Sequence, residues 1–220
     1  MSRPDQNAPV ADDSQATRAL GDLAGAWQLP LTDPQSLALL SYGRLLLDWN
    51  RHINLTGAAT LPALITDHFP DSFVLATRLR DTPEVTTIVD VGSGGGLPAL
   101  PLALLVTHLQ VQLVEPIAKK AAFLRTAVRS LALLDRVRVA SVRLDTFQLE
   151  HPEPFDAAVS RATFHPVDWL SVALPVVRPG GTVFALTTTA NLDPPAGWLP
   201  ATKIPYANDH RWLHELKRST

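Results

Sequence analysis

The sequence of 220 residues contains no cysteine, which excludes disulfides and thiolate metal sites and is compatible with a reducing, cytoplasmic location. It has no apolar run of the roughly 18 residues that a membrane span needs, and its polar first residues do not read as a secretory signal. The seven histidines are scattered and none is part of a paired-carboxylate pattern, so we expect no metal site. What remains is the composition of a globular protein, 46% hydrophobic and 18% charged.

A strong charge of one sign is also lacking, since 19 basic and 21 acidic residues leave a net charge of −2. This balance gives no overall attraction to nucleic acid. The distribution is uneven, because the stretch from Lys119 to Arg143 holds seven basic residues against the single acid Asp135, whereas residues 1–35 hold five acids and two bases. We interpret the basic stretch either as a solvated helix face or as a surface that contacts nucleic-acid phosphates.

The most informative segment is residues 88–98, which read IVDVGSGGGLP. A short apolar run with an aspartate, Asp90, turns through four glycines and continues into a helical pattern. Glycine is needed where the backbone takes a positive φ or lies against a ligand, and Pro98 suits the start of a helix. The segment therefore predicts the first strand, turn and helix of a Rossmann-like fold, with a ligand crevice at the carboxyl edge of its sheet.

The spacing of these glycines bears on which ligand the crevice holds. Dinucleotide sites need GxGxxG, but the sixth position here is Leu97. The turn suits S-adenosylmethionine (AdoMet) better, because AdoMet has no phosphate and lays its amino-acid end along a glycine turn, where Asp90 would meet the ammonium group. Glu115 follows the next predicted strand and is placed to accept hydrogen bonds from a ribose of either cofactor. A dinucleotide, or a turn that binds nothing, remains the alternative.

The rest of the chain predicts an α/β fold with a mostly parallel sheet. Residues 1–12 are polar and we expect them to be disordered, residues 13–80 to form an N-terminal helical extension, and residues 81–220 to form the AdoMet-binding core. Helices are expected near 13–27, 35–50, 60–79, 97–107, 117–133 and 166–177. Strands are expected near 86–91, 110–114, 136–141, 155–160 and 181–187. Residues 178–181 are interpreted as a turn, 190–209 as a proline-rich connection, and 210–218 as a final strand or short helix.

Several separate motifs follow one another in a recognisable order. They read WNRHINLT at 49–56, HFPDS at 68–72, DVGSGGGLPALP at 90–101, KKAAFL at 119–124 and SRA at 160–162. Over residues 35–187 the chain resembles the RsmG family, also called GidB, bacterial methyltransferases of 16S ribosomal RNA. The resemblance implies AdoMet as cofactor, N7 of a guanine as methyl acceptor, and 16S ribosomal RNA or the 30S subunit as partner. We expect a monomer.

The resemblance also implies site residues. Carried over by motif, the AdoMet contacts are Gly92, Leu97, Leu144, Asp145 and Arg161, with Glu115 at a position that holds an acid for the ribose. The glycine turn itself adds Asp90 and Gly94. On the RNA side we expect Asn54, His68, Lys119, Lys120 and Arg161.

Some of these side chains have a plain structural alternative. Asn50, Asn54 and Thr56 either cover the site or serve helix-end and turn chemistry. His68 and Asp71, three positions apart on a helix, either face RNA or make a surface contact with each other. Phe164 either stacks on an unpaired base or is a buried aromatic residue.

The chain departs from the family pattern at its C-terminal edge. The family usually has a lysine just after the fifth strand, where this sequence has Thr187 and Thr188, and residues 211–216 are a poor copy of the family's last strand. Both departures concern the edge that faces the target more than the cofactor crevice.

The implied chemistry needs no general base, because guanine N7 bears no hydrogen. We therefore expect a site rich in positioning groups and poor in catalytic acids and bases. The chain has neither an Asn-Pro-Pro-Tyr-type motif for methylating exocyclic amines nor a cysteine for carbon-5 chemistry. An AdoMet enzyme for a small molecule or protein, or an inactive ribosome-associated binding module, remains the alternative.

Overall fold

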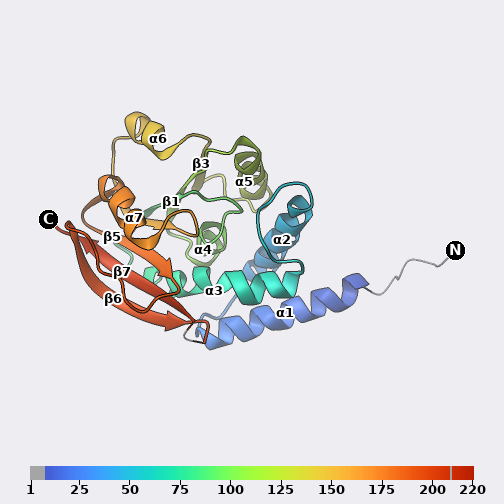
Figure 1. Cartoon of the computed structure of the whole chain (residues 1–220). Coiled ribbons are helices and arrows are strands. Elements are labelled where there is room, and N and C mark those ends of the chain that lie inside the picture. The colour runs from blue at the N-terminus through green and yellow to red at the C-terminus, as the bar shows by residue number, and fades with distance from the viewer. Residues whose placement is uncertain (1–7, 209) are drawn as a thin grey trace.

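The computed structural model describes residues 8–208 and 210–220, and over these residues the chain forms a seven-stranded sheet between two layers of helices (Figure 1). The strand order is β3-β2-β1-β4-β5-β7-β6. The first five pair in parallel, whereas β7 runs antiparallel to β5 and β6 antiparallel to β7. The strands are β1 (Thr87–Val91), β2 (Gln110–Val114), β3 (Val137–Ala140), β4 (Phe155–Ser160), β5 (Val177–Thr187), β6 (Trp198–Tyr206) and β7 (Arg211–Arg218). The expected mostly parallel, Rossmann-like α/β sheet is confirmed.

Helices connect the parallel strands and cover both faces of the sheet. They are α4 (Ala99–Leu105), α5 (Ala118–Ser130), α6 (Leu144–Glu150), α7 (Pro166–Ala173) and the short 3-10 helix η1 (Leu174–Val176). Side chains alternate across each strand, so Ile88 of β1 joins a core with α1 to α5, and its neighbour Val89 joins a second core with α6 and α7. The sheet therefore lies between two separate hydrophobic cores.

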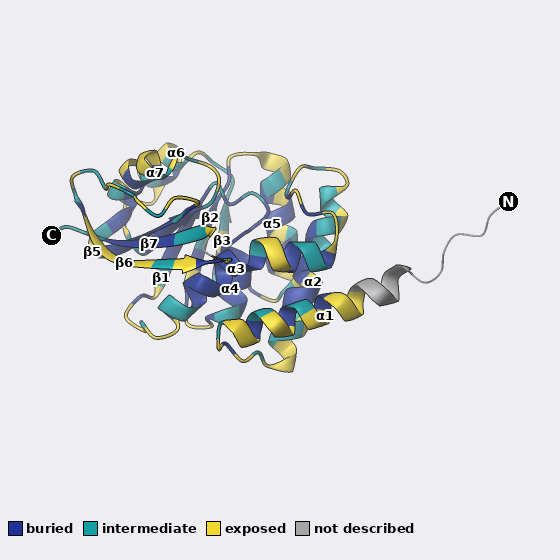
Figure 2. Cartoon of the chain, turned by 60° about the horizontal axis from the view of Figure 1, so that its bottom comes forward, coloured by how far each residue is buried: buried dark blue, intermediate teal, exposed yellow. Residues whose placement is uncertain are grey.

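The N-terminal extension consists of α1 (Ala8–Ala26), α2 (Asp33–Asn50) and α3 (Leu61–Leu79). α2 begins at a capping box, in which the Thr32 hydroxyl accepts a hydrogen bond from the Gln35 amide and the Gln35 side chain accepts one from Thr32. α1 packs along α3 through a buried stripe of Ala16, Leu20 and Ala24, and its other faces are exposed (Figure 2).

The start of α1 differs from the expectation that residues 1–12 are disordered. The helix begins at Ala8, whereas the polar composition of the segment predicted disorder up to residue 12. Residues 1–7 lie outside the described part of the chain.

The C-terminal region also differs from the sequence analysis. The expected proline-rich connection contains β6, which lies at the edge of the sheet and pairs only with β7. Proline lacks a backbone N–H, and an edge strand tolerates Pro200 and Pro205 because it has no second neighbour to bond. The expected turn at 178–181 is a bulge inside β5, where Gly180 takes a φ of +74°. The final segment is strand β7, and α6 was not predicted.

Candidate functional site

The glycine turn after β1 has the backbone that its sequence predicts. Gly92, Gly94 and Gly96 have φ angles of +74°, +53° and +81°, which favour glycine. A Cβ added to Gly92 would lie 2.4 Å from Oγ1 of Thr163, so the loop after β4 packs directly on the turn. A Cβ added to Gly94 would meet only the carbonyl oxygen of Gly92, at 3.8 Å. The turn thus presents bare backbone to open space beside Gly94.

Asp90 lies next to this turn with its carboxylate buried and unpartnered. The residue is 1% exposed, and neither carboxylate oxygen has a hydrogen-bond partner among the residues that the structure describes. Burial raises the pKa of Asp90 to about 7; the nearby Ser93 side chain and the Arg161 guanidinium oppose the rise, and the Glu115 carboxylate adds to it. A buried acceptor without a donor is costly, so this carboxylate fits a cationic ligand group such as the ammonium of AdoMet.

Glu115 braces the turn from the end of β2. Its Oε2 accepts a hydrogen bond of 2.8 Å from the Gly94 amide, and its Oε1 accepts one of 2.8 Å from the Ile117 amide. The side chain is buried, and these bonds hold the turn against the start of α5. Its predicted contact with a ribose stays a prediction.

A first cavity of about 470 Å³ opens beside the turn, at the carboxyl ends of β1 and β2. Its lining includes three predicted cofactor residues, namely Gly92, Leu144 and Asp145. Asp145 accepts a hydrogen bond of 2.7 Å from the Thr146 amide, which holds the pKa of this carboxyl below its usual range. The other predicted cofactor residues are not in this lining, namely Asp90, Gly94, Leu97, Glu115 and Arg161. The Leu97 side chain is 5% exposed and packs in the core with α1 to α5, and Arg161 lines a neighbouring cavity.

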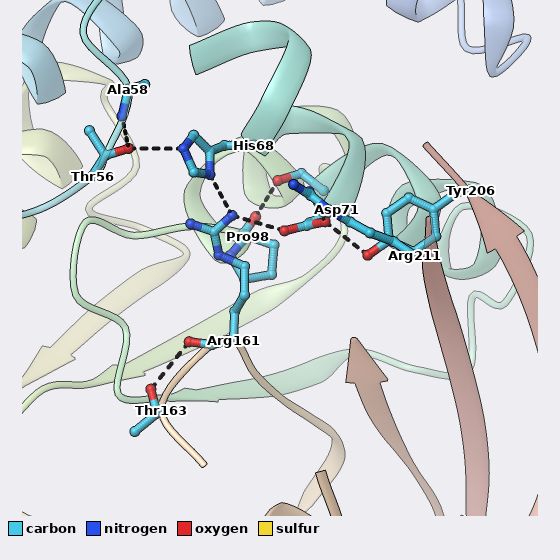
Figure 3. A network of polar contacts seen from close by, with 10 residues as sticks. Thr56, Ala58, His68, Asp71, Pro98, Arg161, Thr163, Tyr206 and Arg211 are labelled. Carbon is cyan, nitrogen blue, oxygen red and sulfur yellow. Dashed lines mark hydrogen bonds and ion pairs between the residues drawn. The ribbon is translucent and has the colours of Figure 1, made fainter. Parts of the chain in front are cut away.

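A second cavity of about 390 Å³ adjoins the first, and Phe164 lines both. Its polar wall is built around Asp71, a buried residue of α3 (Figure 3). Oδ2 of Asp71 accepts a hydrogen bond of 2.9 Å from Nη1 of Arg161, and Oδ1 accepts bonds from Nη1 of Arg211 at 3.0 Å and from the Tyr206 hydroxyl at 2.8 Å. One carboxylate therefore joins α3, the loop after β4, and the β6–β7 hairpin.

His68 connects this cluster to the loop after α2. Its Nδ1 lies 3.0 Å from Nη1 of Arg161, and its Nε2 lies 3.1 Å from the Thr56 hydroxyl (Figure 3). Burial and then the Arg161 charge lower the pKa of His68, so its neutral form is favoured. The alternative of a His68–Asp71 surface contact is wrong, because both side chains turn inward to Arg161.

The asparagines before this loop have different surroundings. Asn50 fixes the loop, since its side chain bonds the Thr56 carbonyl oxygen at 2.9 Å and accepts from the amides of Leu55 and Thr56. Asn54 is exposed and makes no side-chain hydrogen bond within the described chain. Asn50 thus has the turn role that the sequence left open, and Asn54 stays a prediction.

Lys119 and Lys120 lie in the first turn of α5, away from both cavity linings. Lys119 is exposed and Lys120 partly exposed. They flank the cavities rather than enter them, and their contact with RNA stays a prediction.

Tyr206 and Arg211 belong to this wall, although the sequence did not predict them as site residues. They are the last residue of β6 and the first of β7, and they reach Asp71 because β7 pairs with β5. Their only signal in the sequence was the departure noted at residues 211–216.

Two further features are absent from residues 8–208 and 210–220. No group of His, Cys, Asp or Glu there could hold a metal ion. No helix in those ranges has both the length and the apolar character to cross a membrane.

Comparison with known proteins bears on the identity of this site. A family model described as GidB, rRNA small subunit methyltransferase G, matches residues 35–194. The chain is 36% identical over 183 residues to the ribosomal RNA small subunit methyltransferase G of Burkholderia ambifaria (strain MC40-6), covering 82% of this chain and 79% of that protein. The same figures hold for the protein of that name from Burkholderia multivorans (strain ATCC 17616 / 249).

Solved structures share the fold at much lower identity. An O-methyltransferase from Bacillus cereus, in complex with SAH, is 18% identical with a TM-score of 0.63, covering 91% of this chain and 97% of that one. A methyltransferase from Geobacter sulfurreducens is 17% identical with a TM-score of 0.58, covering 93% and 96%. These likenesses confirm a methyltransferase type of Rossmann-like fold.

Proposed function

This chain belongs to the GidB family, rRNA small subunit methyltransferase G, and on that premise we propose that it transfers a methyl group from AdoMet to N7 of a guanine in 16S ribosomal RNA. The observation that carries the proposal is the pair of cavities that meet at Phe164, at the carboxyl edge of the sheet. A donor in one and an acceptor base in the other would approach each other directly, beside that residue. Ligands of open α/β sheets bind at this edge.

The first cavity is the proposed AdoMet site. The unpartnered carboxylate of Asp90 would hold the ammonium group, and the turn from Gly92 to Gly94 would carry the amino-acid end. Glu115 would serve the ribose, while Leu144 and Asp145 would border the adenine; Leu97 would act through its backbone. When bound, AdoMet supplies a methyl group already activated on a sulfonium.

The second cavity is the proposed acceptor site. Its groups capable of acid–base work are already engaged: Asp71 accepts from Arg161, Arg211 and Tyr206, and both ring nitrogens of His68 have partners. No carboxylate or imidazole of this wall is left to remove a proton from an acceptor. This arrangement favours an acceptor without a proton, such as guanine N7, over an amine or hydroxyl. The residues would then act by orientation and exclusion of water, which supplies roughly 7–11 kcal/mol in favourable cases.

The test is methyl transfer to unmethylated ribosomal RNA. Purified protein with labelled AdoMet should methylate 16S RNA or 30S subunits from cells that lack it, and mapping should find N7-methylguanine that is absent from those cells. Normal AdoMet binding without transfer to either substrate would contradict the proposal. A labelled acceptor that survives RNase would indicate a small molecule or protein instead.

A second prediction concerns the basic face of α5. Replacing Lys119 and Lys120 with glutamate should weaken RNA binding and reduce the slope of log affinity against log salt by about one phosphate contact per lysine, because each contact releases counterions. The measurement is a salt titration of RNA binding by fluorescence anisotropy. As a control with the same change of charge, replacing the exposed Arg18 and Arg80 with glutamate should leave the slope closer to the wild type. Equal slopes for the two double variants would move the RNA surface elsewhere.

A further inference from the structure

Asp71 holds two arginines at the wall of the second cavity, and the two guanidinium groups are only partly occupied. The Asp71 side chain is 4% exposed, against 19% for Arg161 and 31% for Arg211. Each guanidinium contacts Asp71 through Nη1, and no hydrogen bond among the described residues uses Nε or Nη2 of either one. A guanidinium carries five N–H donors. Most donors of both arginines therefore remain available beside a buried carboxylate that fixes their positions.

The charges of this cavity do not cancel. Its ionisable lining consists of His68, Asp71, Tyr206 and the two arginines. The lowered pKa of His68 favours the neutral ring, and burial followed by the Asp71 charge raises the pKa of Tyr206, which stays a neutral donor. Two positive charges thus face one negative charge. A partly enclosed cavity with an excess positive charge and free N–H donors favours an anionic ligand.

The proposed reaction narrows the identity of this anion. The most common arginine contact with guanine is a fork onto O6 and N7, but N7 must keep its lone pair free to accept the methyl group. A guanidinium fork on the acceptor base would therefore block the reaction. The other chemical group that a guanidinium fork matches in RNA is the phosphate of the backbone.

Resting on the proposed function, we propose that Arg161 and Arg211, held by Asp71, bind a backbone phosphate of the RNA strand at or beside the acceptor guanine. Arg211 is the positioning residue that this assignment adds, since it comes from the β6–β7 hairpin rather than from the cofactor crevice. The phosphate would fix the strand while Phe164 and the cavity wall orient the base. The hairpin thereby contributes to choosing how RNA enters the site.

The proposal is tested by replacing Arg211 with glutamine and with lysine, using 16S RNA from cells that lack the protein as the probe. Arg211→Gln should weaken RNA binding about tenfold, as expected for a lost hydrogen bond to a charged group, and should lower the salt slope by about one contact. Arg211→Lys keeps the charge, so it should keep the salt slope while losing the fork. AdoMet affinity, measured by calorimetry, should stay at the wild-type value in both variants.

The matched control is Arg80→Gln, since Arg80 also pairs with an aspartate, Asp81, at 3.0 Å but lies beyond the end of α3. Thermal midpoints show whether each variant is folded. RNA binding by Arg211→Gln equal to that of the control overturns the proposal, as does a lysine variant with the same reduced slope as the glutamine variant. Loss of AdoMet affinity without loss of RNA affinity would assign the anion to the cofactor carboxylate and also overturns it. Absence of methyl transfer by the wild type is a separate outcome, because it contradicts the proposed function while the RNA titration still reports on Arg211.

Discussion

Replacing Asp90 with asparagine is expected to weaken AdoMet binding by roughly 100-fold or more while making the free protein more stable at neutral pH. The carboxylate is buried without a partner, so its negative charge is unfavourable until a cation arrives. Asparagine removes the charge at nearly the same volume and so removes both the cost and the attraction. Calorimetry with AdoMet and thermal unfolding of the same samples measure the two effects.

The pH dependence of stability has a definite sign. The pKa of Asp90 is raised from 3.8 to about 7 in the fold, so its contribution to stability is fully present below pH 3.8 and is lost as pH rises through about 7. The loss amounts to at most about 4 kcal/mol, at about 1.4 kcal/mol per pKa unit. The unpartnered amide of asparagine retains part of that cost, and we expect a net gain of about 1–2 kcal/mol for Asp90→Asn at pH 8. This gain should shrink toward pH 5.

AdoMet affinity of the wild type should depend on the same carboxyl group. Below about pH 7 the free protein carries a protonated Asp90, which must lose its proton before it can pair with an ammonium group. Affinity should therefore fall by up to about tenfold per pH unit below 7 and level off above it. In Asp90→Asn this dependence should disappear. A wild-type affinity that is constant from pH 5 to 8 would contradict the assignment of Asp90.

Asp156 provides the matched control, because it is an aspartate of the same sheet whose pKa is shifted in the opposite direction to that of Asp90. Partial burial opposes the shift, but Arg178 and the amides of Thr86 and Thr87 hold the pKa of Asp156 well below its usual range. Its contribution to stability is therefore present above the unfolded pKa and lost as pH falls. Asp156→Asn should destabilise the protein at neutral pH and leave AdoMet affinity unchanged. Comparison of the two variants thus separates the general effect of losing a carboxylate in the sheet from the specific effect of losing the Asp90 carboxylate.

The glycine turn and the strands around it could be predicted from the sequence because their requirements are local. The segment from Asp90 to Gly96 contains both the backbone requirement and the acid, and Glu115 follows the next strand directly. The strands on either side are apolar runs of the length that buried parallel strands have, so their order followed from their alternation with helices.

The polar wall of the second cavity could not be predicted in the same way, because it depends on contacts between distant segments. Asp71 meets Tyr206 and Arg211 only after β7 has paired with β5 and β6 with β7. The prolines that hid β6 are acceptable only at an edge, and whether a strand lies at an edge is a property of the whole sheet. α6 gave a weak signal too, since it has seven residues and no side-chain cap. The departures at Thr187 and Arg211 marked this region as unusual without indicating what it contacts.

A substitution in the glycine turn is also expected to have a large effect on AdoMet binding. Gly94→Val should abolish AdoMet binding, with an affinity at least roughly 100-fold lower, while the protein still folds. At a φ of +53° a branched side chain is strained, by about 1–2 kcal/mol, but a Cβ there meets no protein atom closer than 3.8 Å. The valine would therefore project into the open space beside the turn, which is the proposed place of the cofactor.

Gly180→Val separates backbone strain from occlusion of the site. Gly180 has a φ of +74° at the β5 bulge, and a Cβ there would meet only Nη1 of Arg178, at 3.9 Å. The two valine variants should lose similar thermal stability, because both place a branched residue in left-handed backbone with open space around it. Only Gly94→Val should lose AdoMet, as measured by calorimetry. If both variants bound AdoMet with wild-type affinity, the turn would not be the binding site of the cofactor. If both lost AdoMet binding equally, backbone strain rather than occlusion of the space beside Gly94 would explain the loss.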